Sequence, residues 1–258
     1  MGALHAGHVS LMKLAAQRCD IVVASIFVNP TQFAPDEDLA KYPRPLEADL
    51  SACRAAGVAC VFHPDVPTMY PPDSVTFVEV EQLTNVLEGA HRPNHFRGVT
   101  TVVMKLLNIV QPDTVFFGQK DYQQQLIIRR MCIDLDVPTE IVTCPTIRDP
   151  DGLAMSSRNR YLSDKERATA LSISAALRAV EQGVADGESD LFVLRTQMQK
   201  SLNAMDDVEL DYATIVDPDS LLEIDSVQAT QVALIAAKVG ATRLIDNLII
   251  QTANDGGN

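Results

Sequence analysis

The sequence has 258 residues, of which 47% are hydrophobic and 21% are charged, and its formal net charge is -13. A chain of this kind can bury the core of one large domain or two modest ones, and its acidity argues against nucleic acid as a partner, because a phosphate backbone requires a basic surface. No apolar run approaches the roughly 18 residues of a membrane span, and the five cysteines form no C-x-x-C pair, so we expect a cytoplasmic protein with reduced thiols.

The first residues predict a phosphate-binding loop. Met1-Gly2-Ala3-Leu4-His5-Ala6-Gly7-His8 carries two histidines, and the run that follows from Val9 to Arg18 has a helical pattern, so we expect His8 to open a helix. Glycine lets the backbone approach a ligand, the free N-H groups of a helix N-terminus favour an anion, and each imidazole can donate to a phosphoryl oxygen. The alternative is an exposed histidine at an ordinary helix cap.

No strand precedes this loop, although a phosphate loop in an open α/β sheet normally follows one. We therefore expect either that Met1 is an internal methionine taken as the start or that the chain is truncated. In both cases the parallel sheet would lack its first strand.

Strands and helices alternate over the next part of the chain. We predict strands at 20–28, 58–62, 76–80, 114–117 and 140–144, and helices at 46–56, 99–110 and 122–135. The nearly unbroken apolar run at 20–28 is typical of a strand covered on both faces. It leads to Asn29-Pro30-Thr31-Gln32-Phe33, at the edge where such sheets hold ligands, and Gln32 offers a donor and an acceptor there. The alternative is an ordinary turn amide.

Three further loops carry polar side chains. Residues 88–98 contain two histidines and two arginines, and either cover a substrate or form a solvated connection. The strand at 114–117 delivers Gly118-Gln119-Lys120-Asp121 to a helix N-terminus, where a lysine favours an anion, although a surface pair of Lys120 with Asp121 is the alternative. The long loop at 145–161 includes Met155-Ser156-Ser157-Arg158, a mobile clamp suited to a polyphosphate.

The last part of the chain has a different pattern. Amphipathic helices at 164–182 and 189–205 precede β-rich segments at 208–216, 231–238 and 243–250. Helices followed by a run of strands indicate a separate α+β domain. The whole chain is thus predicted to be an α/β protein whose larger domain has parallel strands.

Six ordered motifs make the chain resemble the pantothenate synthetase (pantoate-β-alanine ligase) family, in the H-x-G-H nucleotidyltransferase superfamily. They are M-G-A-L-H-x-G-H at 1–8, S-I-F-V-N-P-x-Q-F at 25–33, Y-P-R at 42–44, H-F-x-G-V at 95–99, F-F-G-x-K-D-Y-Q-Q at 116–124 and M-S-S-R-N-x-Y-L at 155–162. The resemblance implies a Rossmann-like domain at 1–148 that binds ATP and pantoate, and a smaller α+β lid domain at 149–258. It also implies a cytoplasmic homodimer that uses ATP with Mg²⁺ and has neither nucleic acid nor a membrane as a partner.

The resemblance assigns roles to individual residues. It implies a catalytic set of His8, the proton donor, with His5, Lys120, Ser156 and Arg158. The residues it places along ATP are Met1, Gly2, Ala3, Leu4, His5, Ala6, Gly7, His8, Gly118, Gln119, Lys120, Asp121, Ile147, Met155, Ser156, Ser157 and Arg158. Gln32 and Gln124 would hold pantoate, while Arg92 and His95 are secondary members of the site. Metal ligands stay unassigned, including within Glu47-Ala48-Asp49.

The activity that the resemblance implies is an AMP-forming ligation in coenzyme A precursor biosynthesis. Pantoate would react with ATP to give pantoyl adenylate and pyrophosphate, and β-alanine would then convert the adenylate to pantothenate and AMP. The chain departs from the family at Gln119, where many members have glutamate, and in lacking a strand before the first motif. The alternatives are another nucleotidyltransferase of the same group and a non-catalytic nucleotide-binding protein.

Overall fold

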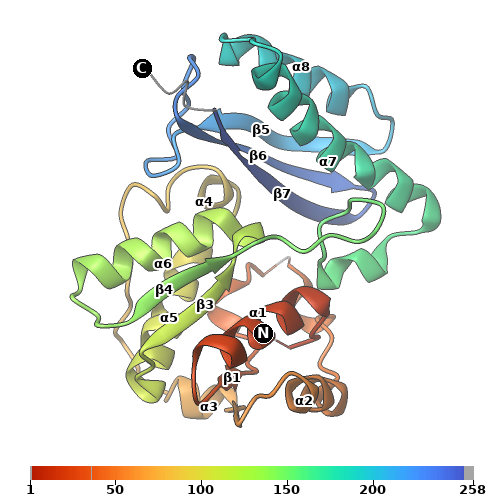
Figure 1. The fold of residues 1–258 in the computed structure, drawn as a ribbon. Coiled ribbons are helices and arrows are strands. Elements are labelled where there is room, and N and C mark those ends of the chain that lie inside the picture. Colours follow the sequence, from red (N-terminus) through yellow and green to blue (C-terminus); the bar gives the residue numbers. More distant parts are fainter. Residues whose placement is uncertain (1, 36, 253–258) are drawn as a thin grey trace. The chain divides into compact units, whose positions relative to one another are not determined.

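Short β-branched runs in the first half of the chain form two parallel strand pairs in the computed structural model, which describes residues 2–35 and 37–252 (Figure 1). The pairs are β1 (Val23–Ser25) with β2 (Cys60–Phe62) and β3 (Thr114–Gly118) with β4 (Glu140–Cys144). All four strands belong to a compact unit that ends at Ile147, and a second unit begins at Arg148. The α/β class is confirmed, with the described parallel strands in two small sheets rather than one continuous sheet.

Helices occupy much of the rest of the first unit. They are α1 (Ala6–Arg18), α2 (Leu46–Ala55), α3 (Val66–Met69), α4 (Glu88–His91), α5 (His95–Val110) and α6 (Tyr122–Asp134), with 3₁₀ turns η1 (Pro30–Gln32), η2 (Asp38–Ala40) and η3 (Gln119–Asp121). Helices α1 and α6 pack on β3, and α5 packs on both α6 and η1. Apolar residues of α5 and α6, among them Val99, Ile127 and Ile128, form a shared core. This core fixes η1, at the end of the β1 segment, against α5.

Two predicted strands differ in the structure. The segment predicted as a strand covered on both faces is a strand only over Val23–Ser25, and Ile21 and Val23 are 72% and 39% exposed. Within the described residues β1 pairs with β2 alone. Its side chains are therefore less covered than those of a central strand, which are buried on both faces. The predicted strand at 76–80 is not a strand, because helix side chains bind its backbone: the Val78 N-H donates to Thr101 Oγ1, and the Thr100 hydroxyl donates to the Val78 carbonyl.

The second unit contains a three-stranded sheet covered by helices. Its elements are η4 (Ser157–Tyr161), α7 (Asp164–Ala185), α8 (Leu191–Asn203), β5 (Val208–Val216), β6 (Thr230–Val239) and β7 (Thr242–Gln251). The strands are antiparallel in the order β5-β6-β7, and both α7 and α8 pack on this sheet (Figure 1). A capping box between Ser163 and Glu166 begins α7. The α+β character predicted for this part of the chain is confirmed.

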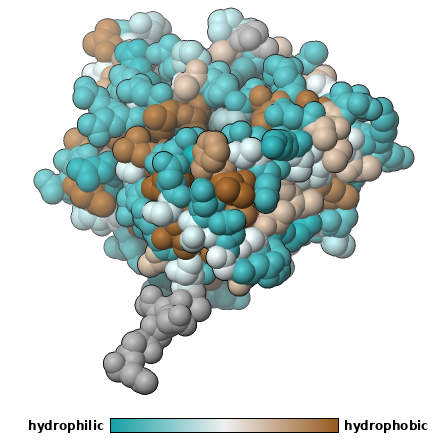
Figure 2. All heavy atoms as spheres, turned by 90° about the horizontal axis from the view of Figure 1, so that it is seen from above, coloured by the Kyte–Doolittle hydropathy of each residue, from teal (hydrophilic) through white to brown (hydrophobic). Residues whose placement is uncertain are grey.

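Hydrophilic side chains cover much of the face seen in Figure 2, with apolar side chains among them. Such a mixture is normal for protein surfaces. None of the helices in the described part of the chain combines the length and apolar character needed to cross a bilayer. All five cysteines lie in the described part, and none of them forms a disulfide.

Candidate active site

The histidine pair at the start of the chain forms a helix cap. Helix α1 begins at Ala6 with His5 as its N-cap, so the expectation that His8 opens the helix is wrong. The Gly7 N-H donates to His5 Nδ1 at 3.2 Å, and the His5 N-H donates to His8 Nδ1 at 3.3 Å. The ring nitrogens therefore satisfy backbone N-H groups that a serine and a glutamate satisfy in an ordinary capping box.

These contacts decide which ring nitrogens carry protons. A backbone N-H can only donate, so Nδ1 of His5 and Nδ1 of His8 are both acceptors, and each neutral ring holds its proton on Nε2. The ring centroids are 4.1 Å apart. Burial, and then the electrostatic effect of the adjacent His5 whenever it is protonated and of Lys120, lower the pKa of His8 from 6.5 to about 3. His8 is therefore uncharged at neutral pH, and its Nε2-H can donate to a ligand oxygen.

Lys120 lies in the same unit as the two histidines. It belongs to η3, between the end of β3 and the first turn of α6, as the sequence predicts. Its charge reaches His8, since it contributes to the low pKa of that ring. Gly118 precedes it at the strand end, and a side-chain carbon built there would meet no other atom within 4 Å. The loop at 118–121 thus combines a cation, a helix N-terminus and open space, which together suit an anion.

Asp49 also belongs to this site, although its residue type and position did not indicate a role. Its carboxylate, 2% exposed on α2, accepts the Ala3 N-H at 2.8 Å and the Leu4 N-H at 2.7 Å. Gly2 and Ala3 have positive φ angles of 103° and 52°, which fold this loop back over Asp49. The acidic first turn of α2 was visible in the sequence, but its pairing with residues more than forty positions earlier was not. Met1, predicted to contact ATP, lies outside the described residues.

The side chain of Gln32 is held by Asn29, which is itself held by other residues. It lies in η1 and is 8% exposed. The Asn29 side-chain amide donates to Gln32 Oε1 at 3.0 Å and to the Gly98 carbonyl at 3.1 Å, and the Tyr70 hydroxyl donates to Asn29 Oδ1 at 2.9 Å. Because Oε1 of Gln32 accepts from Asn29, the orientation of the Gln32 amide is fixed.

Three consecutive glutamines on α6 have different surroundings. The buried Gln123 donates to the carbonyls of Leu83 and Val86 and so supports the segment before α4. Gln125 accepts from the Thr143 hydroxyl and packs toward β4. Gln124 is half-buried, and its side chain makes no hydrogen bond to the described residues. Of the three, Gln124 is the one whose amide is not used by the fold.

Two helices replace much of the loop predicted at 88–98. Helix α4 and the first turn of α5 occupy this segment, so much of it is helical rather than an irregular loop, and its substrate-covering role stays a prediction. Arg92 and His95 lie between and within these helices, and Arg92 binds Glu37 with Nε and one terminal nitrogen at 2.7 and 2.8 Å. The physical reason is that His95, Phe96 and Gly98 are buried in the core, which orders their backbone.

A cavity of about 540 Å³ opens beside the loop at 2–4 in the first unit. Its lining is Gly2, Ile26, Phe27, Val28, Pro30, Leu39, Arg44, Leu46, Asp49, His63, Pro64, Asp65 and Val66. The volume suits a small organic molecule, and the lining combines apolar side chains with a few charged ones, as ligand pockets do.

The predicted serine-arginine clamp belongs to the second unit. Ser156 caps η4 by accepting the Arg158 N-H at 3.2 Å, and Met155, Ser157 and Arg158 are half-buried. Ile147 is the half-buried last residue of the first unit. The structure therefore brings His5, His8 and Lys120 together in one unit, whereas convergence of the clamp with them stays a prediction.

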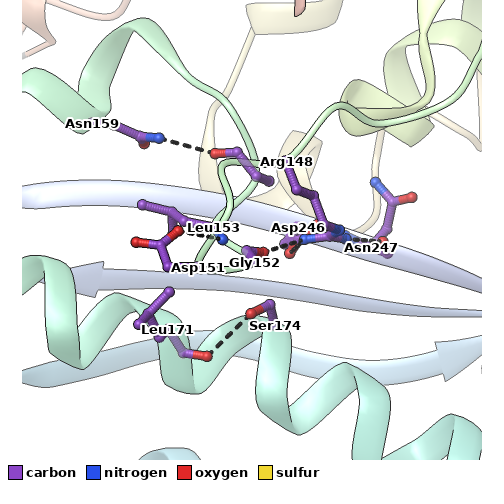
Figure 3. A network of polar contacts seen from close by, with 10 residues as sticks. Arg148, Asp151, Gly152, Leu153, Asn159, Leu171, Ser174, Asp246 and Asn247 are labelled. Atoms are coloured by element: carbon purple, nitrogen blue, oxygen red, sulfur yellow. Dashed lines mark hydrogen bonds and ion pairs between the residues drawn. The ribbon is translucent and has the colours of Figure 1, made fainter.

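The segment before the clamp is more ordered than the predicted long loop. Residues 148 and 154 form a β-bridge, and the guanidinium of Arg148 binds Asp246 on β7 at 2.6 and 2.9 Å (Figure 3). Arg148 also donates to the Gly152 carbonyl, and the Asn159 amide donates to the Ala154 carbonyl at 3.0 Å (Figure 3). The residues that lead into the clamp are therefore attached to β7 through Arg148 and do not form a flexible loop.

Comparison with known proteins yields a consistent set of matches. The family model described as pantoate-beta-alanine ligase matches residues 1–249. Pantothenate synthetases from Moorella thermoacetica and Acidobacterium capsulatum are 51% and 53% identical to the chain, and each alignment covers 97% of it and 89% and 84% of the relative.

Solved structures agree with these matches. A crystal structure of pantothenate synthetase from Thermus thermophilus matches with a TM-score of 0.94 and 45% identity, over 96% of this chain and 90% of the other. Pantoate-beta-alanine ligase from Francisella tularensis, complexed with beta-gamma ATP and beta-alanine, matches with a TM-score of 0.77 and 35% identity over 96% of this chain and 87% of the other.

Proposed function

This chain belongs to the pantoate-beta-alanine ligase family, and from that premise we propose that it condenses pantoate with β-alanine to pantothenate in a reaction driven by ATP. The observation that carries the proposal is the pair of Nε2-H donors on His5 and His8, in the same unit as Lys120 and in a chain about half identical to pantothenate synthetases. Such donors suit a phosphoryl group on which negative charge builds.

The first step activates a carboxylate. A carboxylate resists attack by an amine, because it is a poor electrophile with a poor leaving group. The pantoate carboxylate attacks the α-phosphorus of ATP, the bond to the bridging oxygen breaks, and pyrophosphate leaves with the electron pair. The product is the mixed anhydride pantoyl adenylate. Catalysis in such a step rests on positioning and on neutralising charge rather than on covalent bonds to the protein.

The histidines, Lys120 and the clamp have separate roles in this step. His8 donates from Nε2 to a phosphate oxygen, and His5 provides a second such donor beside it. Lys120 supplies positive charge at the N-terminus of α6, while Ser156 and Arg158 bind the departing pyrophosphate. Losing one donor of this kind typically lowers the rate on the order of 100-fold. The residues at 2–8, 118–121, 147 and 155–158 line the nucleotide.

Gln32 and Gln124 hold pantoate in this proposal. The amide of Gln32 is oriented by Asn29, and the amide of Gln124 is not used by the fold. In the second step the amine of β-alanine attacks the acyl carbon of the adenylate, AMP leaves, and the amide forms. Exclusion of water protects the anhydride before the amine arrives.

Mg²⁺ is proposed as the ion that accompanies ATP. The described residues contain no group of three or more His, Cys, Asp or Glu side chains able to hold a metal, and both Asp49 oxygens are bound by backbone N-H groups. These residues fit an ion held by the phosphate oxygens and water, the usual mode for magnesium on nucleotides. When bound, the ion would supply charge neutralisation for the leaving group.

We also propose that the protein is a cytoplasmic homodimer, as its family resemblance implies. The reduced state of the five cysteines is consistent with the cytoplasm. Sedimentation analysis of the purified protein tests the assembly, and a mass equal to one chain of 28.1 kDa at micromolar concentration would contradict it.

Isotope exchange between ATP and pyrophosphate tests the reaction. Exchange should require pantoate and should proceed without β-alanine, and addition of β-alanine should release AMP and pantothenate in equal amounts. Exchange supported by a different acid would favour another nucleotidyltransferase of the group. Binding of ATP without any exchange would favour a non-catalytic nucleotide-binding protein.

A further inference from the structure

A chain of hydrogen bonds connects the loop after η1 back to η1 itself. Gln32 ends η1, and its carbonyl oxygen lies 2.8 Å from His95 Nδ1. His95 Nε2 lies 3.0 Å from a terminal nitrogen of Arg92, whose other nitrogens bind the Glu37 carboxylate at 2.7 and 2.8 Å. Four side chains or backbone groups from two segments of the first unit therefore form one continuous path.

The direction of this path follows from the chemistry of arginine. A guanidinium has only donors, so the Arg92 nitrogen donates to His95 Nε2, which must be unprotonated. The proton of the neutral ring is then on Nδ1 and is donated to the Gln32 carbonyl. Arg92 thus selects the one tautomer of His95 that can hold the backbone of Gln32.

Charge and burial support the same arrangement. His95 is 7% exposed, and its pKa is lowered to about 4 by burial and then by Arg92, against smaller opposing contributions from the Gln32 carbonyl, Glu37 and Glu88. The Arg92 and Glu37 side chains are 16% and 21% exposed, so their bidentate pair is largely shielded from water. Burial alone would raise the pKa of Glu37, but the hydrogen bonds and charge of Arg92 lower it below its usual value. Glu37 is therefore ionised and keeps Arg92 in place.

We propose that Glu37, Arg92 and His95 are positioning residues for pantoate, acting through Gln32 rather than touching the substrate. This inference rests on the proposed role of Gln32 in binding pantoate. The carbonyl of Gln32 is fixed by His95 and its side-chain oxygen by Asn29, so both ends of the residue are anchored. Positioned groups of this kind lower the entropy that substrate binding must overcome.

The test measures the KM for pantoate and the KM for ATP separately in ATP-pyrophosphate exchange. His95→Ala removes the donor to Gln32 and should raise the pantoate KM about tenfold while the ATP KM stays within about twofold. His95→Asn places an amide N-H near the position of Nδ1 and should restore the pantoate KM to within about threefold of the wild-type value. Glu37→Gln removes the charge that holds Arg92 and should raise the pantoate KM about threefold.

The double variant Glu37→Gln with His95→Ala gives a readout that a merely structural role would not produce. If both residues act along one path, the double variant should be no worse than His95→Ala alone, whereas independent effects would multiply. A matched control is Asp211→Asn, which breaks the similarly buried pair of Arg243 and Asp211 in the second unit and should leave both KM values unchanged.

Three results would overturn the positioning role. They are an unrescued His95→Asn variant, an ATP KM that rises as much as the pantoate KM, and multiplicative effects in the double variant. If His95→Ala does not fold, His95→Asn and Glu37→Gln still decide the question, because the path requires the first to stay near wild type and the second to weaken pantoate binding. Absence of pantoate-dependent exchange in the wild-type protein would instead refute the proposed function.

Discussion

Gly98→Ala is expected to disrupt the contact between α5 and η1. A Cβ atom at residue 98 would lie 2.4 Å from the Thr31 carbonyl oxygen, 2.6 Å from the Thr31 carbonyl carbon and 2.7 Å from the Gln32 nitrogen. All three neighbours are backbone atoms, which cannot move aside as a flexible side chain can. To reach ordinary contact distances α5 and η1 would have to separate by about 1 Å.

Two effects contribute to the cost of this substitution. Overpacking against a rigid neighbour typically costs about 1–3 kcal/mol. The separation would also stretch the hydrogen bond from the Asn29 amide to the Gly98 carbonyl, and an unsatisfied buried polar group costs about 1–3 kcal/mol. Asn29 is 1% exposed, so water cannot replace the lost partner without rearrangement. We expect the first unit to lose about 2–6 kcal/mol of unfolding free energy.

Hydrogen exchange resolved by peptide measures this loss in the first unit alone. Amides of α5 should exchange faster in Gly98→Ala, and the pantoate KM should rise because Gln32 shifts. Gly118→Ala is the control for stability, since a Cβ there meets nothing within 4 Å and the residue has a φ of -77°. Wild-type protection of α5 together with an unchanged pantoate KM in Gly98→Ala would refute the reasoning.

Three further predictions concern other parts of the site. The pKa of His8 is about 3 in the folded chain and near 6.5 in the unfolded chain. Between these pH values the unfolded chain binds more protons than the folded chain. The free energy of unfolding therefore falls on acidification by up to about 1.4 kcal/mol per pH unit. His8→Gln should therefore lose less stability between pH 7 and pH 5 than wild type in urea titrations, and an equal loss would contradict this. Asp49→Asn turns one acceptor into a donor that opposes the N-H groups of the loop at 2–4, so the ATP KM in exchange assays should rise about tenfold, whereas an unchanged value would exclude this role. Arg148→Met leaves the carboxylate of Asp246, 4% exposed, without its partner and should cost the second unit about 3–5 kcal/mol by urea unfolding. Arg130→Met, which breaks an exposed pair, should cost less than about 1 kcal/mol, and equal losses in the two variants would refute the argument.

Local patterns in the sequence predict much of the secondary structure. The strands at 140–144 and 208–216 have the predicted bounds, and the helix predicted at 122–135 differs by one residue at its end. Periodicity of apolar residues and a change of pattern after residue 163 are local properties, so they can be read without knowing the contacts. The family resemblance was equally local, because its motifs are short ordered stretches.

Positions that depend on distant partners could not be predicted in the same way. The segment at 88–98 contains many polar residues, yet burial of His95 and Phe96 makes part of it helical. The apolar run at 20–28 predicts a buried strand, but burial depends on what covers each face, and Ile21 is exposed.

The site shows the same division between sequence and tertiary structure. The sequence by itself identified the histidine pair, Lys120 and Gln32 as candidates, because their types and flanking glycines or strands are local signals. The roles of Asp49 on the first loop, and of Glu37 on Gln32 through Arg92 and His95, became visible from the folded contacts. The physical reason is that these hydrogen bonds join residues tens of positions apart, and such partners are chosen by the packing of helices and strands rather than by neighbours in the chain.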